Sequence, residues 1–321
     1  MGQNKWYIGL ALFSLALVLM GPQTIYGQRN SIIVVEGNFS SSVAVSHILK
    51  VMFESKLNIP METKRMAAAI AFPGMEKGEV DVYTELWWPN SAEMMEKYYD
   101  QGKKVEGTVL YENCEQGIYV PTWVSKKYGI TEIMDLNKHS EMFDFDRDKI
   151  GDIWAGSRTW RSTEITIFKV KGYGLNLTPY VVEQWAFLAQ FIEGMRKQKP
   201  MVFYYWTPEW LFAKYDLTLL KEPPFDPNKW KYVEGDFKNS NVLMQLQPAK
   251  VYISYSTSLK DRLPKAYKFF KNFYIPKDEV NNLIMEIEEF PDKLKKDPME
   301  VAKKWISEHP DIVNNWLKGV Q

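Results

Sequence analysis

The chain has 321 residues, which is enough for two lobes of about 100–150 residues each. It carries 40 basic and 40 acidic residues, so its formal net charge is zero, and no basic block stands out. This balance argues against a nucleic-acid-binding protein, which would carry a positive stripe.

The first residues have the pattern of an export signal. Lys5 gives a positive start, an apolar run extends from Tyr7 to Met20, and small residues follow up to Gly27. We expect a signal peptide over residues 1–27 and a periplasmic mature protein. A membrane anchor is the alternative, but the run is shorter than a full span. The only cysteine, Cys114, lies far from this region, so no lipid-attachment residue is expected.

After this segment, short apolar runs alternate with helical patterns, which indicates an α/β fold with mostly parallel strands. Strands are expected over residues 31–35, 81–86, 116–120, 201–206 and 251–255. Serines 40–42 should cap a helix with apolar positions at 45, 48, 49, 52 and 53. Further helices should start at Pro89 and cover residues 180–198. From residue 258 onward the chain should be almost entirely helical, in pieces separated by Pro264, Pro276, Pro291 and Pro310.

No Pro/Gly/Ser-rich linker divides the chain, so two lobes require it to cross between them more than once. The expected crossings are the strands at 116–120 and 251–255. Residues 28–117 and 256–321 would form the first lobe, and residues 118–255 the second.

Three tryptophans occupy similar local contexts. Trp87 follows a predicted strand, while Trp160 and Trp206 each lead into a predicted helix, with Thr207 expected as the N-cap of the helix after Trp206. In open α/β sheets, ligands bind beyond the carboxyl ends of the strands, where such loops gather. A single tryptophan near a helix start is more often a packing residue.

The stretches around these residues resemble the glycine betaine/proline betaine-binding proteins of ABC importers. The resemblance covers residues 31–317, and its strongest parts are GEVDVYTELWWPN (78–90), EQGIYVPTWVSKKYGI (115–130) and KPMVFYYWTPEWLFAKYDLTLL (199–220). It implies a two-lobed periplasmic-binding-protein architecture of type II, the venus-flytrap kind, with two hinge crossings. It also implies that Trp87, Trp160 and Trp206 form a cage around a trimethylammonium head, and that the protein works with a membrane permease as a monomer.

The physical chemistry suits this assignment. A trimethylammonium group has no N–H to donate, so aromatic faces must select it. The other end of a betaine is a carboxylate, and the backbone N–H groups of Arg161 and Ser162 would open a helix toward it, with the side chains of Ser162 and Thr163 as further donors. Alternatively, Ser162 and Thr163 cap their own helix.

The sequence departs from the family at two positions. Many members carry histidine where this chain has Ser91 and Glu209. Ser91 would donate to a carboxylate more weakly than a protonated histidine. Glu209 would favour a cation if it faced the cleft, although a solvent-facing position in the first helical turn is the simpler expectation. The choice between glycine betaine and choline, carnitine or trimethylamine N-oxide therefore stays open.

The residues do not indicate an enzyme, a metal site or a cofactor. His47, His139 and His309 lack metal-ligand spacing, and the acidic surroundings of Cys114 do not favour a thiolate. Asp81 and Glu85 could form a carboxylate pair at a strand mouth, which is a common arrangement. An exported enzyme acting on trimethylammonium compounds and the binding subunit of a sensor are the alternatives from other classes.

Overall fold

The computed structural model describes residues 29–37, 39–145, 148–288 and 296–320. The predicted signal peptide, residues 1–27, and Pro291 lie outside the described residues. Within the described part, no helix is long and apolar enough to cross a membrane.

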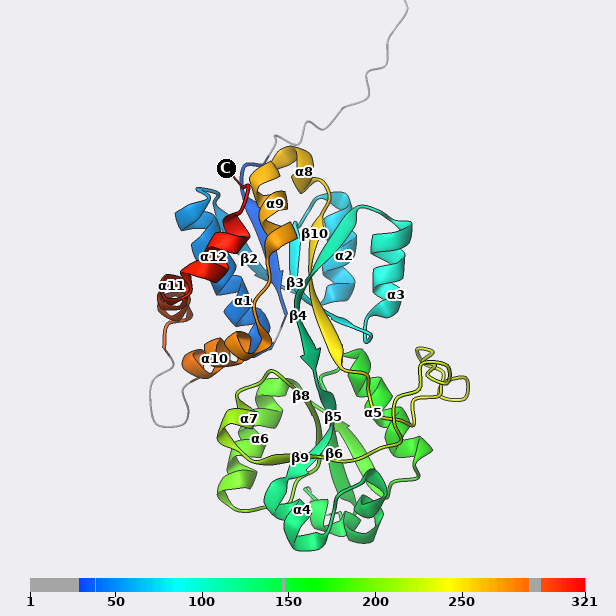
Figure 1. Cartoon of the computed structure of the whole chain (residues 1–321). Helices are drawn as coiled ribbons and strands as arrows, with labels where there is room; N and C mark the ends of the chain where they lie inside the picture. The colour runs from blue at the N-terminus through cyan, green and yellow to red at the C-terminus, as the bar shows by residue number, and fades with distance from the viewer. Residues whose placement is uncertain (1–28, 38, 146–147, 289–295, 321) are drawn as a thin grey trace, which may run out of the picture.

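Two mixed β-sheets form the centres of two lobes, one above the other in Figure 1. The first sheet has the order β2-β1-β3-β10-β4, with bounds Met61–Arg65, Ile32–Glu36, Val82–Trp88, Ala249–Ser256 and Val105–Cys114. The second has the order β7-β6-β8-β5-β9, with bounds Leu177–Val181, Gly151–Gly156, Phe203–Trp206, Gln116–Pro121 and Leu217–Leu219. The predicted α/β class with two lobes is confirmed.

The sequence pattern predicted mostly parallel strands, and this prediction is wrong, because both sheets contain parallel and antiparallel pairs. β1 runs parallel to β2 and β3, and β6 runs parallel to β7 and β8. β10 is antiparallel to β3 and β4, and β5 is antiparallel to β8 and β9. β5 and β10 are the first strands after each crossing between the lobes, and each enters its sheet from the opposite end.

Helices cover both faces of each sheet. The first lobe carries α1 (Ser40–Val51) with a π-helical extension (Met52–Lys56), α2 (Ala68–Lys77), α3 (Ala92–Met95) extended by Glu96–Gln101, α8 (Leu259–Arg262), α9 (Pro264–Asn272), α10 (Lys277–Ile287), α11 (Pro298–Glu308) and α12 (Pro310–Leu317). The second carries α4 (Thr122–Tyr128), a 3-10 helix (Ile133–Phe143), α5 (Arg161–Gly172), α6 (Gln184–Arg196) and α7 (Leu211–Lys214).

Several predicted helix ends are wrong for identifiable reasons. Phe39, not a serine, precedes α1; Ser41 and Ser42 instead bond to Glu85 and to the backbone N–H of Gly37. Residues 180 and 181 belong to β7, so the helix predicted from residue 180 begins at Gln184. The helix expected at Pro89 begins at Ala92.

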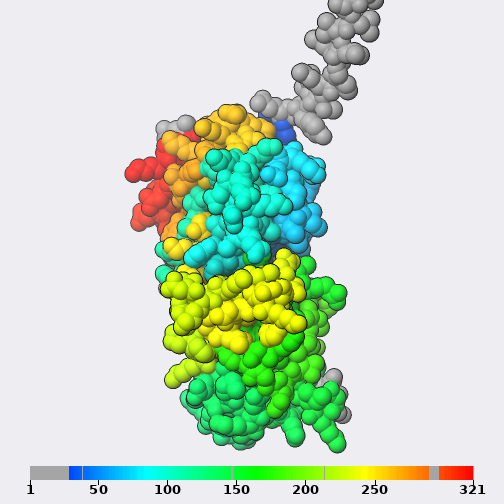
Figure 2. Space-filling model, turned by 90° about the vertical axis from the view of Figure 1, so that its right-hand side faces the viewer, coloured from blue at the N-terminus to red at the C-terminus, as the bar shows by residue number. Residues whose placement is uncertain are grey.

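The chain crosses between the lobes twice. Glu115 alone separates β4 from β5, close to the predicted crossing. The return runs from β9 to β10 through residues 220–248, and Figure 2 shows this yellow segment covering the face where the lobes meet. Because β10 pairs with β3 and β4, residues 249–255 lie in the first sheet, whereas the predicted division gave them to the second lobe.

A buried ion pair fixes the return segment to the second lobe. The Lys169 ammonium on α5 donates to Glu222 at 2.6 and 2.7 Å and to the Met244 carbonyl at 2.7 Å. The two charged side chains are 2% and 1% exposed. A pair of this kind stabilises the fold weakly as a whole, but removal of one partner leaves an uncompensated buried charge.

We therefore predict that Glu222→Gln lowers the free energy of unfolding by about 3–5 kcal/mol, because Lys169 loses its counter-ion. Urea unfolding followed by circular dichroism measures the change. The control is Glu193→Gln, which removes an exposed carboxylate that pairs with Arg196 and Lys197 and should leave the midpoint unchanged. Equal midpoints for all three proteins would contradict the prediction.

Candidate functional site

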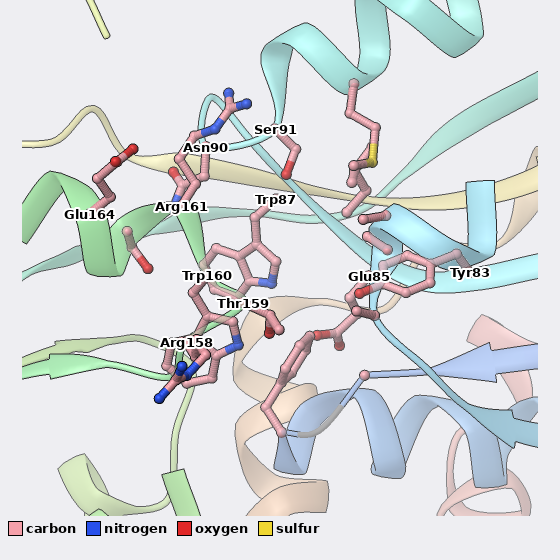
Figure 3. A pocket seen from close by; sticks show the side chains of 18 of the residues that line it. Tyr83, Glu85, Trp87, Asn90, Ser91, Arg158, Thr159, Trp160, Arg161 and Glu164 are labelled. Carbon is pink, nitrogen blue, oxygen red and sulfur yellow. The ribbon is translucent and has the colours of Figure 1, made fainter. Parts of the chain in front are cut away.

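A cavity of about 770 Å³ lies between the lobes and is lined by residues of both. The first lobe contributes residues of β3, α2 and the loop before α3, and the second contributes the residues around the start of α5 and the end of β8. Figure 3 shows these side chains around one hollow. We call this space the interlobe cavity.

Six of the eight predicted site residues line the interlobe cavity: Trp87, Trp160, Trp206, Arg161, Ser162 and Ser91. Trp87 is near the end of β3, Trp206 is the last residue of β8, and Trp160 immediately precedes α5. The ends of three strand-to-helix connections thus meet at one place, as expected for α/β sheets.

The three tryptophans, hereafter the tryptophan cluster, form the walls of a corner. The ring of Trp206 is nearly perpendicular to both of the others, at 88° to Trp160 with centroids 4.9 Å apart and at 80° to Trp87 with centroids 6.4 Å apart. Trp87 comes from the first lobe and the other two from the second. Edge-to-face contact is a favourable arrangement for such rings, so the cluster joins the lobes as it shapes the cavity.

Other aromatic residues of the second lobe pack against this cluster. Tyr205 stacks on Trp206 at 4.6 Å, and Trp154 contacts Trp160 at 5.9 Å. Trp154 stacks in turn on Phe187 at 3.9 Å and is fully buried. This packing restricts the orientation of the cavity-facing rings.

Thr163 and Glu209 do not line the cavity. The Thr163 hydroxyl donates to the Ser157 carbonyl at 2.6 Å, and a Cβ at Gly156, whose φ is +128°, would lie 2.4 Å from that hydroxyl oxygen. Glu209 is fully buried, contrary to the solvent-facing expectation, and accepts a 3.0 Å bond from Gln184.

Thr207 is not the N-cap of α7, which is Trp210. The Thr207 hydroxyl instead accepts a hydrogen bond from the Glu115 N–H at 3.0 Å.

Polar contacts also join the lobes. The side chains of Asn90 and Gln116 exchange bonds of 2.8 and 2.9 Å, and the Tyr204 hydroxyl donates to Gln116 at 2.8 Å. In a second contact between the lobes, Arg161 donates to Glu93 at 2.8 Å. Arg161 is therefore engaged with a carboxylate of the opposite lobe.

Glu85 is one of the cavity residues that the sequence prediction did not place in the ligand site. Its side chain lies on β3 two residues before Trp87 and lines the same hollow, as Figure 3 shows. Glu85 is 2% exposed, and burial raises its pKa to about 7. The side chains of Tyr111, Ser41 and Trp87 act in the opposite direction, because hydrogen bonding to the carboxylate lowers the pKa. The available signal was its strand position, since residues i and i+2 share a face.

The suggested pairing of Glu85 with Asp81 does not occur. Asp81 is neutralised by ion pairs with Arg29 and Arg262 and accepts a 2.7 Å bond from the Ile33 N–H. Asp81 lies just before β3 and does not line the cavity. Glu85 is thus the deeply buried carboxyl of this cavity, with no counter-ion of its own among the described residues.

Comparison with known proteins identifies the family. The model for the substrate-binding domain of ABC-type glycine betaine transport systems matches residues 30–308. The chain belongs to this family. Its members are binding proteins and not enzymes, and they work with ABC transporter permeases.

Individual relatives agree with this assignment. The glycine betaine-binding periplasmic protein OusX of Dickeya dadantii is 23% identical over 78% of this chain and 78% of its own length. The glycine betaine/carnitine transport binding protein GbuC of Listeria monocytogenes is 30% identical, but the match spans 40% of this chain and only 35% of that relative. The lactococcal OpuAC structure in its closed, glycine betaine-bound form has a TM-score of 0.69 at 20% identity and covers 90% of this chain and 99% of its own. The expected type II architecture is confirmed by this likeness.

We predict that Thr163→Val lowers the free energy of unfolding by about 0.5–1.5 kcal/mol, because the buried Ser157 carbonyl loses one of its two donors and keeps only the Trp160 N–H at 3.1 Å. Urea unfolding measures the loss. A variant as stable as the native protein would show that the hydroxyl is not needed for the fold, and would reopen its assignment as a ligand donor.

Proposed function

We propose that this protein captures a quaternary-ammonium solute in the interlobe cavity outside the cytoplasm and delivers it to an ABC importer in the membrane. The observation that carries the proposal is the tryptophan cluster, which presents indole faces from both lobes to one hollow. Family membership supports the same function.

The tryptophan cluster suits a cation that cannot donate hydrogen bonds. Each indole face within about 6 Å of such a cation contributes roughly 0.5–2 kcal/mol, so three contribute on the order of 2–6 kcal/mol. Micromolar binding requires about 8 kcal/mol. The remainder must come from a second contact.

For a betaine, the second contact is with its carboxylate. Arg161 and Ser162 line the cavity at the N-terminus of α5, and helix N-termini favour anions. Ser91 and Asn90 line the same space from the first lobe. We propose that Ser162 and Ser91 contact the polar end of the ligand, and that Thr163 and Glu209 hold the surrounding structure.

Lobe closure completes the site in this proposal. The cavity is lined by residues of both lobes, so rotation of the lobes toward each other excludes water from the cation and strengthens its contacts. The closed form would dock on the permease as a monomer.

We predict that Trp206→Ala weakens binding of glycine betaine at least tenfold, because it removes the ring that contacts both other walls. Isothermal titration calorimetry measures the affinity and the stoichiometry, and ligand recovered intact separates binding from turnover.

The matched control is Trp123→Ala. Trp123 packs in the second lobe against a separate apolar cluster, away from the cavity, so this variant should lose stability and keep its affinity. If Trp206→Ala binds as tightly as the native protein, or Trp123→Ala alone loses affinity, the cavity is not the binding site.

A further inference from the structure

We infer that Glu85 is the specificity-determining counter-ion of this cavity: it gives up its proton to become the anionic partner of the ligand's ammonium group. This inference rests on the proposed function and deepens it, because it makes capture of the cation a proton-releasing event.

The placement of Glu85 is the first observation. The residue lines the interlobe cavity together with Trp87, and its side chain shares a face of β3 with that indole. A ligand whose cationic head contacts the tryptophan cluster therefore lies beside this carboxyl group. Figure 3 shows Glu85 facing the same hollow as Trp87 and Trp160.

The second observation is an incomplete set of hydrogen bonds. Glu85 Oε2 accepts a 2.8 Å bond from the Ser41 hydroxyl. Oε1 is buried with no donor at hydrogen-bonding distance in the described part of the chain, and the Tyr111 hydroxyl and the Trp87 indole only partly offset the effect of burial on the pKa of the group. A buried carboxylate oxygen without a partner is costly. A quaternary ammonium cation entering the cavity cannot donate a hydrogen bond to Oε1, but its charge would offset the cost of ionising the buried carboxyl group.

The groups around Glu85 do not already neutralise it. Those packed against it are Ser41 on α1, Tyr83 on β3, Tyr111 and Cys114 on β4, and, through space, Glu209 after β8. Burial raises the pKa of each of the two tyrosines, the thiol and Glu209, so these groups are largely uncharged near pH 7.

The other charged residues of the cavity walls are Arg65, Arg158, Arg161, Glu164, Glu183 and Glu234. Arg65 is paired with Glu36, and Arg161 with Glu93. Glu164 accepts bonds from the Tyr232 hydroxyl and the Gly235 N–H. None of these arginines forms an ion pair with Glu85 among the described residues.

The direction of the proton linkage follows. In the empty cavity burial holds the pKa of Glu85 at about 7, so the carboxyl is about half protonated at that pH. A fixed positive charge nearby favours the ionised form and lowers the pKa. Binding then releases a proton, and affinity rises with pH until it levels off above about 7.

If Glu85 instead bound the ligand in its protonated form, the pH dependence of the affinity would have the opposite sign. A protonated Glu85 could donate to the carboxylate of a betaine or to an N-oxide oxygen. Binding would then take up a proton, and affinity would fall as pH rises. The location beside Trp87, where the cationic head belongs, favours the counter-ion role. Choline, with a net charge of +1, should therefore show the stronger coupling, and zwitterionic glycine betaine the weaker.

The test is calorimetric titration of the full mature protein with choline and with glycine betaine at pH 6, 7 and 8, in pairs of buffers that differ in ionisation enthalpy. For choline we expect affinity to rise roughly tenfold from pH 6 to pH 8, with release of about half a proton at pH 7. This measurement needs no variant, so it does not depend on how a substitution folds.

Two substitutions test whether the proton released on binding comes from Glu85. Glu85→Gln should bind choline at least tenfold more weakly at pH 8 and show no pH dependence. Glu209→Gln is the matched control, because Glu209 is a second buried carboxyl whose pKa is raised, to about 8, but which lies outside the cavity; it should keep the native pH dependence.

Proton uptake on binding, a flat profile in the native protein, or a pH dependence that survives Glu85→Gln would each overturn the inference. Failure of the proposed function looks different, because neither choline nor glycine betaine would then bind at any pH.

Discussion

The contact of Trp206 with Trp87 and Trp160 is the interaction on which the rest of this arrangement depends. It brings together rings from two sheets, and it does so at the ends of β3 and β8 and at the start of α5. Indoles in these positions need rigid support. Tyr205 provides it by stacking on Trp206, and Trp154 by an edge-to-face contact with Trp160. The aromatic residues around the site thus form two layers: the tryptophan cluster faces the cavity, and Tyr205 and Trp154 support it from behind.

Four buried carboxyl groups show how differently the fold treats negative charge. Asp81 is balanced by Arg29 and Arg262, and Glu222 by Lys169. Glu85 and Glu209 lack such partners among the ion pairs of the described residues, and burial raises the pKa of both. The balanced pairs secure chain segments, whereas Glu85 lines the interlobe cavity and Glu209 is buried three residues after Trp206 in the chain. Placement of unbalanced carboxyls near a cavity is a frequent feature of functional sites.

Much of the fold and most of the candidate site could be predicted from the sequence. The positions of β1, β3, β5, β8 and β10 followed from short apolar runs, whereas β2, β4, β6, β7 and β9 were not predicted. The three tryptophans could be located because each adjoins a strand or helix end. The side-chain positions of Thr163 and Glu209 could not be predicted, because local spacing does not show whether a side chain bonds to neighbouring groups of its lobe or faces a cavity. The sequence suggested Glu85 only as a carboxylate partner of Asp81 and not as a cavity residue, because strand spacing does not show that the side chains of Ser41 on α1 and of Tyr111 and Cys114 on β4 surround it. The cavity wall from the return segment was also missed, since residues 220–248 carry no regular pattern.

The single residue between β4 and β5 has a further consequence. The Glu115 N–H donates to the Thr207 hydroxyl, and its carbonyl accepts from the Thr207 N–H at 2.8 Å, which ties this crossing to the residue after Trp206. The other crossing enters β10 at Ala249, beside the pairing of Val251 with Trp87. An axis of rotation through both crossings would therefore pass close to Trp87 and Trp206. Atoms near a rotation axis move only a short way, so the distance between the Trp87 and Trp206 rings would change little. Residues at the rim of the cavity, far from the axis, would move much further.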